Sequence, residues 1–302
     1  MPSTTPRVNA WIFLNEDEPS GTNYQSSNSC YQTLIKNHVY QSVDMLFLCF
    51  VTTMPTSPTT VPAGDGSSYT ISTGSVSHPG GLTNEQYLKW IIRDARASKP
   101  GIKIGVTLNW GDGSLLANIF PNPNAPDQAS ADKFAANLVA YLQAYGLDGF
   151  DIDWESPICD DTTQQQFSLL INAIGTQFRK QSRKLYLTLS PASVGNLDAA
   201  AVNANVDFVN LQLYSGFTRP ADFTAAGVKA ALFAYGAKWE SGYQTAQQAF
   251  KDNVAHYRYP AFTAWRLNSD NYPFEQAQQQ ALYSLVYPKG GDAEGEAIEV
   301  PA

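Results

Sequence analysis

Short apolar runs alternate along the chain with longer stretches in which apolar residues recur every three or four positions. The short runs predict strands, and the longer periodic stretches predict helices. One run, Val-Asp-Met-Leu-Phe-Leu-Cys-Phe-Val-Thr, is nearly continuous in apolar residues, as in a strand buried on both faces. Such alternation is typical of βα units around a parallel sheet. We expect strands at 7–14, 43–52, 102–109, 147–154, 184–190, 206–214, 229–235 and 261–267.

The periodic stretches carry recognisable helix ends. Thr83 and Gln86 fit a capping box that begins the first helix, and Pro100-Gly101 ends it. Eight strands interleaved with helices predict one α/β domain, a (β/α)8 TIM barrel spanning 1–302. We expect the further helices at 131–145, 163–181, 242–256 and 274–287.

Two segments stand apart from this pattern. Residues 53–80 are mostly Pro, Thr, Ser and Gly, and predict a long loop with a short hairpin at 68–72. Loops of this length in compact domains are usually functional. From about 289 the chain is acidic, and we expect a loose tail.

Composition narrows the classes of protein. The net charge is −8, and no Lys/Arg-rich run appears, which argues against nucleic acid and anionic membranes as partners. No apolar run approaches the roughly 18 residues of a membrane span. The first residues lack the apolar core of a signal peptide, so export by that route is absent or a leader has been removed. We expect a monomer that needs no cofactor.

The three cysteines and three histidines show no zinc-like spacing. Cys49 lies in an apolar run, which predicts that its thiol is buried. Cys30 and Cys159 lie in loop-like stretches, and the sequence leaves open whether they pair.

Residues 147–156 hold the strongest chemical signal. The stretch reads Leu-Asp-Gly-Phe-Asp-Ile-Asp-Trp-Glu-Ser, although charged residues form only 15% of the chain. On a strand of period two, Asp151, Asp153 and Glu155 share one face. Carboxyls stacked so closely repel, so some stay protonated and their pKa values separate. A proton-donating acid has this property.

A divalent-cation site or a solvated acidic loop is the alternative. A calcium loop needs oxygen ligands on a flexible turn with a glycine at its bend. The intervening residues here are Phe, Ile and Trp, which belong in a core. A strand is therefore favoured over either alternative, and we expect no metal site.

The pattern Asp-Gly-x-Asp-x-Asp-x-Glu resembles the signature of glycoside hydrolase family 18, the chitinases and endo-β-N-acetylglucosaminidases. The resemblance implies that the stretch is strand four of the barrel, with Glu155 at its carboxyl end. Only about 25 residues separate Tyr235 from Ala261, which leaves no room for the large α+β insertion of some relatives.

The resemblance also implies a substrate-assisted, retaining mechanism. Glu155 would protonate the glycosidic oxygen, and the substrate's acetamide oxygen would attack the anomeric carbon. Asp153 would orient that acetamide, Asp151 would share a proton with Asp153, and Tyr214 would hold the acetamide oxygen. The partner implied is a polymer or oligosaccharide of N-acetylglucosamine.

Five further residues are expected to bind this substrate. Asn210 and Gln212 share the inward face of a strand with Tyr214, where buried polar groups need partners or a ligand. Trp265 matches the position at which the family places an aromatic floor. Trp110 stands where relatives usually show Ser-x-Gly-Gly, and Asp148 opens the acidic motif.

Other side chains have two interpretations. Trp11 and Phe13 are core residues by default or line the cavity, and Trp239 and Glu240 are either buried or in contact with sugar. A non-catalytic sugar-binding protein is the alternative of another class, although the residue at 155 is Glu. An endo-β-N-acetylglucosaminidase acting on N-glycans is the alternative within the family; endo-acting cleavage of chitin outside the cell is the preferred interpretation.

Overall fold

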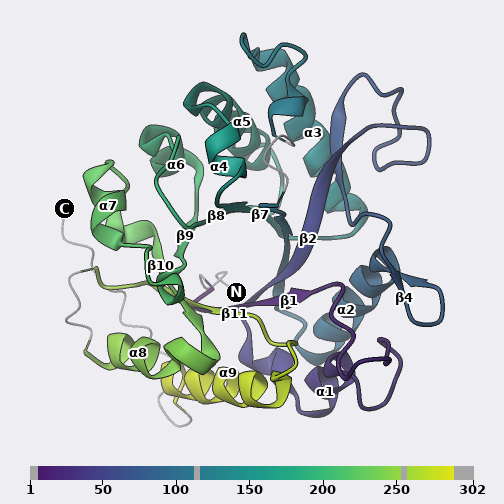
Figure 1. Cartoon of the computed structure of the whole chain (residues 1–302), viewed down its shortest axis with the longest axis vertical. Coiled ribbons are helices and arrows are strands. Elements are labelled where there is room, and N and C mark those ends of the chain that lie inside the picture. Colours follow the sequence, from purple (N-terminus) through teal and green to yellow (C-terminus); the bar gives the residue numbers. More distant parts are fainter. Residues whose placement is uncertain (1–5, 112–115, 253–256, 289–302) are drawn as a thin grey trace.

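The computed structural model describes residues 6–111, 116–252 and 257–288. Eight parallel strands form a closed barrel, and the helices surround it (Figure 1). Pairing of the first two strands closes the ring. This is the expected TIM barrel. Its strands are β1 (Val8–Phe13), β2 (Met45–Pro55), β6 (Lys103–Leu108), β7 (Gly149–Trp154), β8 (Tyr186–Pro191), β9 (Phe208–Leu211), β10 (Phe233–Lys238) and β11 (Ala261–Trp265).

The expected helices are present, with shifted ends. The capping box at Thr83 and Gln86 is formed as the sequence predicts. The last four residues of the predicted helix 242–256 lie outside the described residues. Shorter helices of four to seven residues were not predicted, because so few turns give little periodic signal. The helices are α1 (Cys30–Lys36), α2 (Asn84–Ser98), α3 (Gln128–Ala144), α4 (Ile158–Asp161), α5 (Gln164–Arg179), α6 (Ala199–Asn205), α7 (Pro220–Ala225), α8 (Trp239–Asp252) and α9 (Tyr272–Val286).

The bounds of all eight strands differ from the predicted ones, and two strands differ most. The strand predicted at 206–214 ends at Leu211, and a 3₁₀ turn, Leu213–Ser215, follows it. The strand predicted at 229–235 begins only at Phe233, after another 3₁₀ turn. After Leu211 the apolar–polar alternation continues beyond the residues that pair with a neighbouring strand. Before Phe233, an apolar run forms the 3₁₀ turn instead of a strand.

The predicted loop 53–80 contains regular structure. β2 runs on past the barrel to Pro55, and β3 (Tyr69–Ser72) pairs antiparallel with that extension. The expected hairpin at 68–72 is therefore the outer strand of a larger hairpin. A small sheet of β4 (Ser77–His78) and β5 (Leu82–Thr83) lies outside the barrel and leads into α2. The predicted tail from 289 lies outside the described residues.

Two apolar cores sandwich the barrel wall. Phe150, Ile152 and Trp154 point outward into the layer between strands and helices. A smaller cluster that includes Trp11, Met45 and Phe47 fills the barrel interior. The period-two prediction for β7 is thus confirmed, since its aspartates occupy the opposite, inward face.

Strands β9 and β10 approach each other most closely at Gly236. A Cβ built there would lie 2.2 Å from the Leu211 carbonyl oxygen. We predict that Gly236→Ala lowers the free energy of unfolding by roughly 1–3 kcal/mol, because the strands must separate to admit the methyl group. Urea denaturation would measure it.

Gly101→Ala is the matched control, since a Cβ there would meet no heavy atom within 4 Å. Equal stability of the two variants would contradict the close approach at Gly236.

Candidate active site

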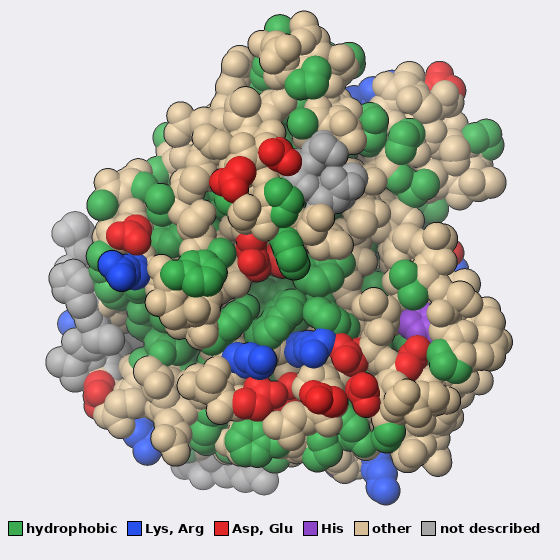
Figure 2. Space-filling view, viewed as in Figure 1, with side chains coloured by type: hydrophobic (Ala, Val, Ile, Leu, Met, Phe, Trp, Pro, Cys, Tyr) green, Lys and Arg blue, Asp and Glu red, His purple; other side chains and the backbone are tan. Residues whose placement is uncertain are grey.

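A pocket opens at the carboxyl end of the barrel strands. Figure 2 shows a hollow near the centre of this face, with hydrophobic side chains inside it and acidic side chains at its edge. The lining residues lie on β1, β7, β8, β9, β10 and β11 or directly after these strands, so residues far apart in sequence meet there. The pocket is lined by Trp11, Asp153, Glu155, Ser190, Asn210, Gln212, Tyr214, Gly236, Thr263 and Trp265.

Asp151 is the deepest of the three carboxyls and is fully buried. Thr188 Oγ1 donates to it at 2.5 Å, and Ser190 Oγ lies 2.9 Å from its Oδ2. Asn210 Nδ2 lies 3.4 Å from Oδ1. Burial raises the pKa of Asp151 to about 6, and these hydrogen bonds oppose the shift. Asp151 therefore changes its protonation state under mildly acidic conditions.

Asp153 and Glu155 are joined through one amide. Gln212 Nε2 lies 3.0 Å from Asp153 Oδ1, 2.8 Å from Glu155 Oε1 and 3.1 Å from the Ser190 carbonyl oxygen. Burial raises the pKa of Asp153 well above its ordinary value, and the charge of Glu155 and a hydrogen bond to that carboxyl raise it further. Asp153 thus holds a proton that it shares with its neighbours, while Glu155 is partly exposed at the pocket mouth.

Tyr214 reaches the pocket from the 3₁₀ turn after β9. Burial raises the pKa of its hydroxyl well above the ordinary value, and the nearby carboxyls of Asp153 and Glu155 add to the shift. The hydroxyl therefore remains protonated and can donate a hydrogen bond to a ligand in the pocket.

An aromatic wall closes the side made by β1 and β11. The ring centroids of Trp265 and Phe13 lie 5.2 Å apart, edge to face, and those of Trp265 and Trp11 lie 6.2 Å apart. Trp11 donates from Nε1 to Thr107 Oγ1 at 3.0 Å, which fixes its ring. Asn268 bonds the backbone N–H and carbonyl of Phe13, both at 3.0 Å, and so holds the end of β1. Trp11, for which a core role was the default, thus lines the pocket.

The structure separates Asp148 from this group. Its carboxylate accepts hydrogen bonds from the Ile104 N–H at 3.0 Å and from Arg96 and Arg183 at 3.1 and 2.7 Å. These contacts lie before β7 begins, at the end of the barrel opposite Glu155. The prediction that Asp148 binds substrate is therefore corrected: this carboxylate ties the amino-terminal ends of two strands to basic side chains.

Trp110 and Trp239 also lie apart from the pocket lining. Trp110 follows β6 and remains 40% exposed, so it stands on the rim. Trp239 begins α8 and is buried, which resolves its two interpretations in favour of burial.

Sequence reasoning missed the polar residues of β8. Thr188 and Ser190 alternate with Leu187 and Leu189 on a strand buried throughout. The signal was present, because polar residues at every second position of a buried strand need partners. Their partner, Asp151, lies on the adjacent strand β7.

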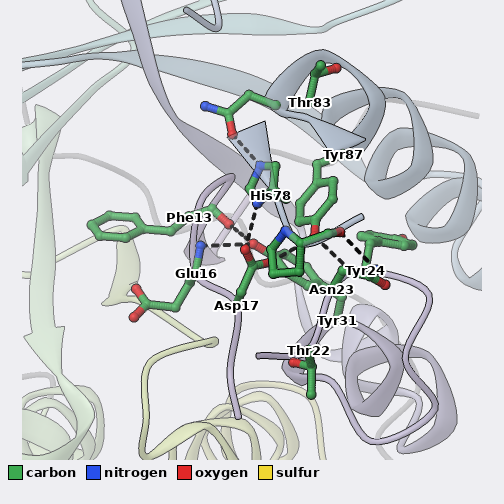
Figure 3. Close-up of polar contacts among 12 residues, drawn as sticks. Phe13, Glu16, Asp17, Thr22, Asn23, Tyr24, Tyr31, His78, Thr83 and Tyr87 are labelled. Carbon is green, nitrogen blue, oxygen red and sulfur yellow. Dashed lines mark hydrogen bonds and ion pairs between the residues drawn. The ribbon is translucent and has the colours of Figure 1, made fainter. Parts of the chain in front are cut away.

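A polar cluster joins the loop after β1 to β4 and the start of α2 (Figure 3). His78 lies with Nδ1 2.8 Å from Asp17 Oδ2 and Nε2 2.7 Å from Asn84 Oδ1. The Tyr87 hydroxyl donates to Asp17 Oδ1 at 2.7 Å, and its ring stacks on the His78 ring. Tyr31 donates to the Phe13 carbonyl at 2.7 Å, which links this cluster to the aromatic wall.

No group of three His, Cys, Asp or Glu side chains in the described part of the chain is arranged to hold a metal ion. Cys30, Cys49 and Cys159 are all free, so the pairing that the sequence left open is not made. None of the described helices is long and apolar enough to cross a membrane.

An acidic ladder on the fourth strand of a TIM barrel, beside an aromatic wall, defines a glycosidase-like class of protein. The profile of Glycosyl hydrolases family 18 matches residues 22–272, so the chain belongs to that family. Chitinase 1 of Aphanocladium album is 33% identical over 103 residues, which cover 30% of this chain and 24% of that protein. Endochitinase of Brugia malayi is 27% identical over 133 residues, 41% of this chain and 25% of that protein. The matched segments thus span about a quarter of these relatives.

Solved structures share the fold over nearly the whole chain. A class V chitinase from Nicotiana tobaccum in complex with NAG4 has a TM-score of 0.61 at 14% identity, covering 92% of this chain and 99% of its own. A fungal endo-β-N-acetylglucosaminidase of family 18 also has a TM-score of 0.61, at 18% identity, with coverage of 93% and 99%. A chitinase-like agglutinin from Robinia pseudoacacia has a TM-score of 0.60 at 12% identity, with coverage of 91% and 99%. At such identities the likeness establishes the fold alone.

The raised pKa of Asp151 predicts an unusual pH dependence of stability. The folded protein holds this proton up to a pH of about 6, whereas the ordinary value is 3.8. Ionisation therefore costs folding free energy, a cost absent below the lower value and complete above the higher one. Relative to Asp151→Asn, the wild-type free energy of unfolding should fall by on the order of 2–3 kcal/mol as pH rises through this window.

Urea denaturation across that pH range would measure the difference between the two proteins. Asp161→Asn, on the exposed side of α4, is the matched control for loss of an aspartate. A difference that stays flat or grows with pH would contradict burial as the cause of the shift.

Proposed function

We propose that this protein is an endo-acting chitinase that cleaves β-1,4 bonds between N-acetylglucosamine units with retention of configuration. The observation that carries the proposal is the bridge of Gln212 between Asp153 and Glu155. It fixes one protonated carboxyl in the pocket and a second, more exposed carboxyl at its mouth. Protein groups in this arrangement can supply a proton at the mouth and hold a polar substituent inside.

In the proposed first step, Glu155 protonates the glycosidic oxygen as the bond to the leaving sugar breaks. The acetamide oxygen of the sugar in the pocket attacks the anomeric carbon and forms an oxazolinium ion. Tyr214 donates a hydrogen bond to that oxygen, and Asp153 accepts a hydrogen bond from the acetamide N–H. This use of the substrate as nucleophile is the recognised exception to the two-carboxylate glycosidases.

Asp151 supports this step from below. It lies one inward position deeper on β7 and shares a proton with Asp153. As positive charge develops on the acetamide, that proton moves toward Asp151 and leaves Asp153 negative beside the oxazolinium N–H. A second step returns the cycle to its start: Glu155, now a base, activates a water that opens the ring and regenerates the acid.

The aromatic wall fits the apolar face of a sugar. Trp265 lies at the mouth of the pocket and is fixed edge to face by Phe13. An aromatic ring offers a pyranose apolar area with a fixed orientation. Most of the short segment between β10 and β11 is α8, which supports a shallow cleft suited to internal cleavage. Because a chitin chain is insoluble, we also propose that the protein acts outside the cell.

Two alternative functions predict different products in the same assay. An endo-β-N-acetylglucosaminidase would share the pocket but prefer a branched N-glycan. A non-catalytic lectin would bind sugar without cleaving it, as the agglutinin and pseudo-chitinase descriptions of two structural neighbours indicate. Incubation with a chitin hexamer and with a high-mannose glycoprotein discriminates the three: products from the hexamer alone support the chitinase, products from the glycoprotein alone the glycan hydrolase, and none the lectin.

We predict that Glu155→Gln abolishes hydrolysis of the chitin hexamer while sugar binding persists. The amide keeps the shape and the contact with Gln212 but has no acidic proton to transfer. Product formation by chromatography and binding by calorimetry would be measured on the same preparation. A variant that retains more than a few per cent of the wild-type rate would place the acid elsewhere.

Asp153→Asn and Tyr214→Phe are each expected to lower kcat by ~10²–10⁴-fold, because both groups stabilise the transition state electrostatically. Steady-state kinetics on the hexamer would measure this. Tyr243→Phe, on α8, is a matched control for the loss of a phenolic hydroxyl. Near-normal kcat in either site variant would argue against the acetamide as nucleophile.

A further inference from the structure

Polar side chains form the bottom, or floor, of the pocket. The acetamide of the proposed substrate would present only its methyl group to this floor. The inward side chains of the barrel form layers two residues apart, about 7 Å along each strand. Trp265 belongs to the layer at the mouth, and Thr263 lies one layer deeper on the same strand. On the other side, Asn210 lies one layer below Gln212. Thr263 and Asn210 both line the pocket.

Two atoms of this floor have no hydrogen-bond partner among the described residues. They are Asn210 Oδ1 and Thr263 Oγ1, on side chains that are only 2% and 1% exposed. Asn210 donates from Nδ2 to Ser190 Oγ at 3.2 Å and toward Asp151. These donations fix the amide, so Oδ1 is turned away from Asp151. Asn9, which faces Thr263 across the β1–β11 pair, is also unpartnered at both amide atoms.

Gly236 keeps the space between these two side chains open. It stands opposite Thr263 in the β10–β11 register, and the proximity of the Leu211 carbonyl oxygen disfavours any larger residue. Strand β10 therefore contributes backbone but no side chain to the floor, and the gap between β9 and β11 remains available to a ligand atom.

The bound acyl group would point into this gap. In the proposed function, on which this inference rests, the acyl carbon turns its oxygen toward Tyr214 and its nitrogen toward Asp153. The three bonds of that planar carbon diverge, so the remaining bond, to the methyl group, points away from both residues. That direction leads to the floor.

We propose that this pocket accepts 2-acylamido sugars whose acyl group ends in a hydroxyl, as in N-glycolylglucosamine. Asn210 Oδ1 can only accept a hydrogen bond, whereas the Thr263 hydroxyl can donate or accept one. A terminal hydroxyl satisfies both, because it donates to Asn210 and accepts from Thr263. A methyl group satisfies neither and leaves both buried atoms without a partner, which is unfavourable. Thr263 and Asn210 are thus specificity-determining residues for the acyl group.

The test compares two glucosamine tetramers, one fully N-acetylated and one fully N-glycolylated. Their dissociation constants are measured by calorimetry on Glu155→Gln protein, so that cleavage does not interfere. The glycolyl tetramer is expected to bind at least as tightly as the acetyl tetramer. Thr263→Val in the same background should weaken glycolyl binding relative to acetyl binding by roughly tenfold or more, since it removes one donor without changing shape.

Thr162→Val is the matched control. Thr162 Oγ1 is likewise buried and unpartnered within the described chain, but Thr162 does not line the pocket. This variant should leave the ratio of the two dissociation constants unchanged. Thr263→Ser keeps the hydroxyl and should keep the glycolyl preference, which guards against a loss that reflects packing alone.

Tenfold weaker binding of the glycolyl tetramer to Glu155→Gln protein would overturn the inference, since it would mean that the floor only accommodates water or a methyl group. Equal weakening of both tetramers by Thr263→Val would overturn it as well. Binding of the acetyl tetramer alone leaves the proposed function standing, whereas failure to bind either tetramer removes both. If Thr263→Val does not fold, the ratio in the Glu155→Gln protein still decides.

Discussion

Three carboxyls lie on one face of a single strand inside the barrel, and the function that we propose for the pocket depends on them. Asp151, Asp153 and Glu155 are alternate residues, so the backbone forces them together, and burial disfavours their charged forms. The three carboxyls differ in their surroundings: Asp151 is buried and bonded by several donors, and burial raises the pKa of Asp153 well above its ordinary value. Glu155 is partly exposed to solvent. In the mechanism that we propose, this gradient lets the proton of Asp153 move inward to Asp151 while Glu155 protonates the leaving group.

Polar side chains of the neighbouring strands donate hydrogen bonds to these carboxyls. β8 supplies hydroxyls to Asp151, and β9 supplies the amides of Asn210 and Gln212. Because Gln212 donates to both Asp153 and Glu155, its replacement would alter the environment of two carboxyls at once. Asn210 Oδ1 and Thr263 Oγ1, at the bottom of the pocket, have no hydrogen-bond partner in the described chain, and we propose that a ligand bonds them.

The sequence predicted the barrel and the ladder because both follow from short-range periodicity. It misplaced Asp148. Asp148 and Glu155 belong to one motif, but the strand between them spans the barrel, so the two carboxyls lie at opposite ends of it. The sequence also extended the strand after residue 211, where alternation persists although pairing stops. The hydrogen bonds between Asn268 and the Phe13 backbone join residues 255 apart in the sequence, so no local sequence pattern indicates them.

The most direct test of the substrate-assisted mechanism is inhibition by a thiazoline analogue of the oxazolinium ion built on an N-acetylglucosamine disaccharide. Sites bind intermediates more tightly than ground states. The account predicts competitive inhibition, with an inhibition constant at least a hundredfold below the dissociation constant of the disaccharide, in keeping with roughly 10²-fold or more for such analogues. Inhibition no tighter than the disaccharide, together with a glycosyl adduct on a protein carboxyl in mass spectrometry, would contradict it.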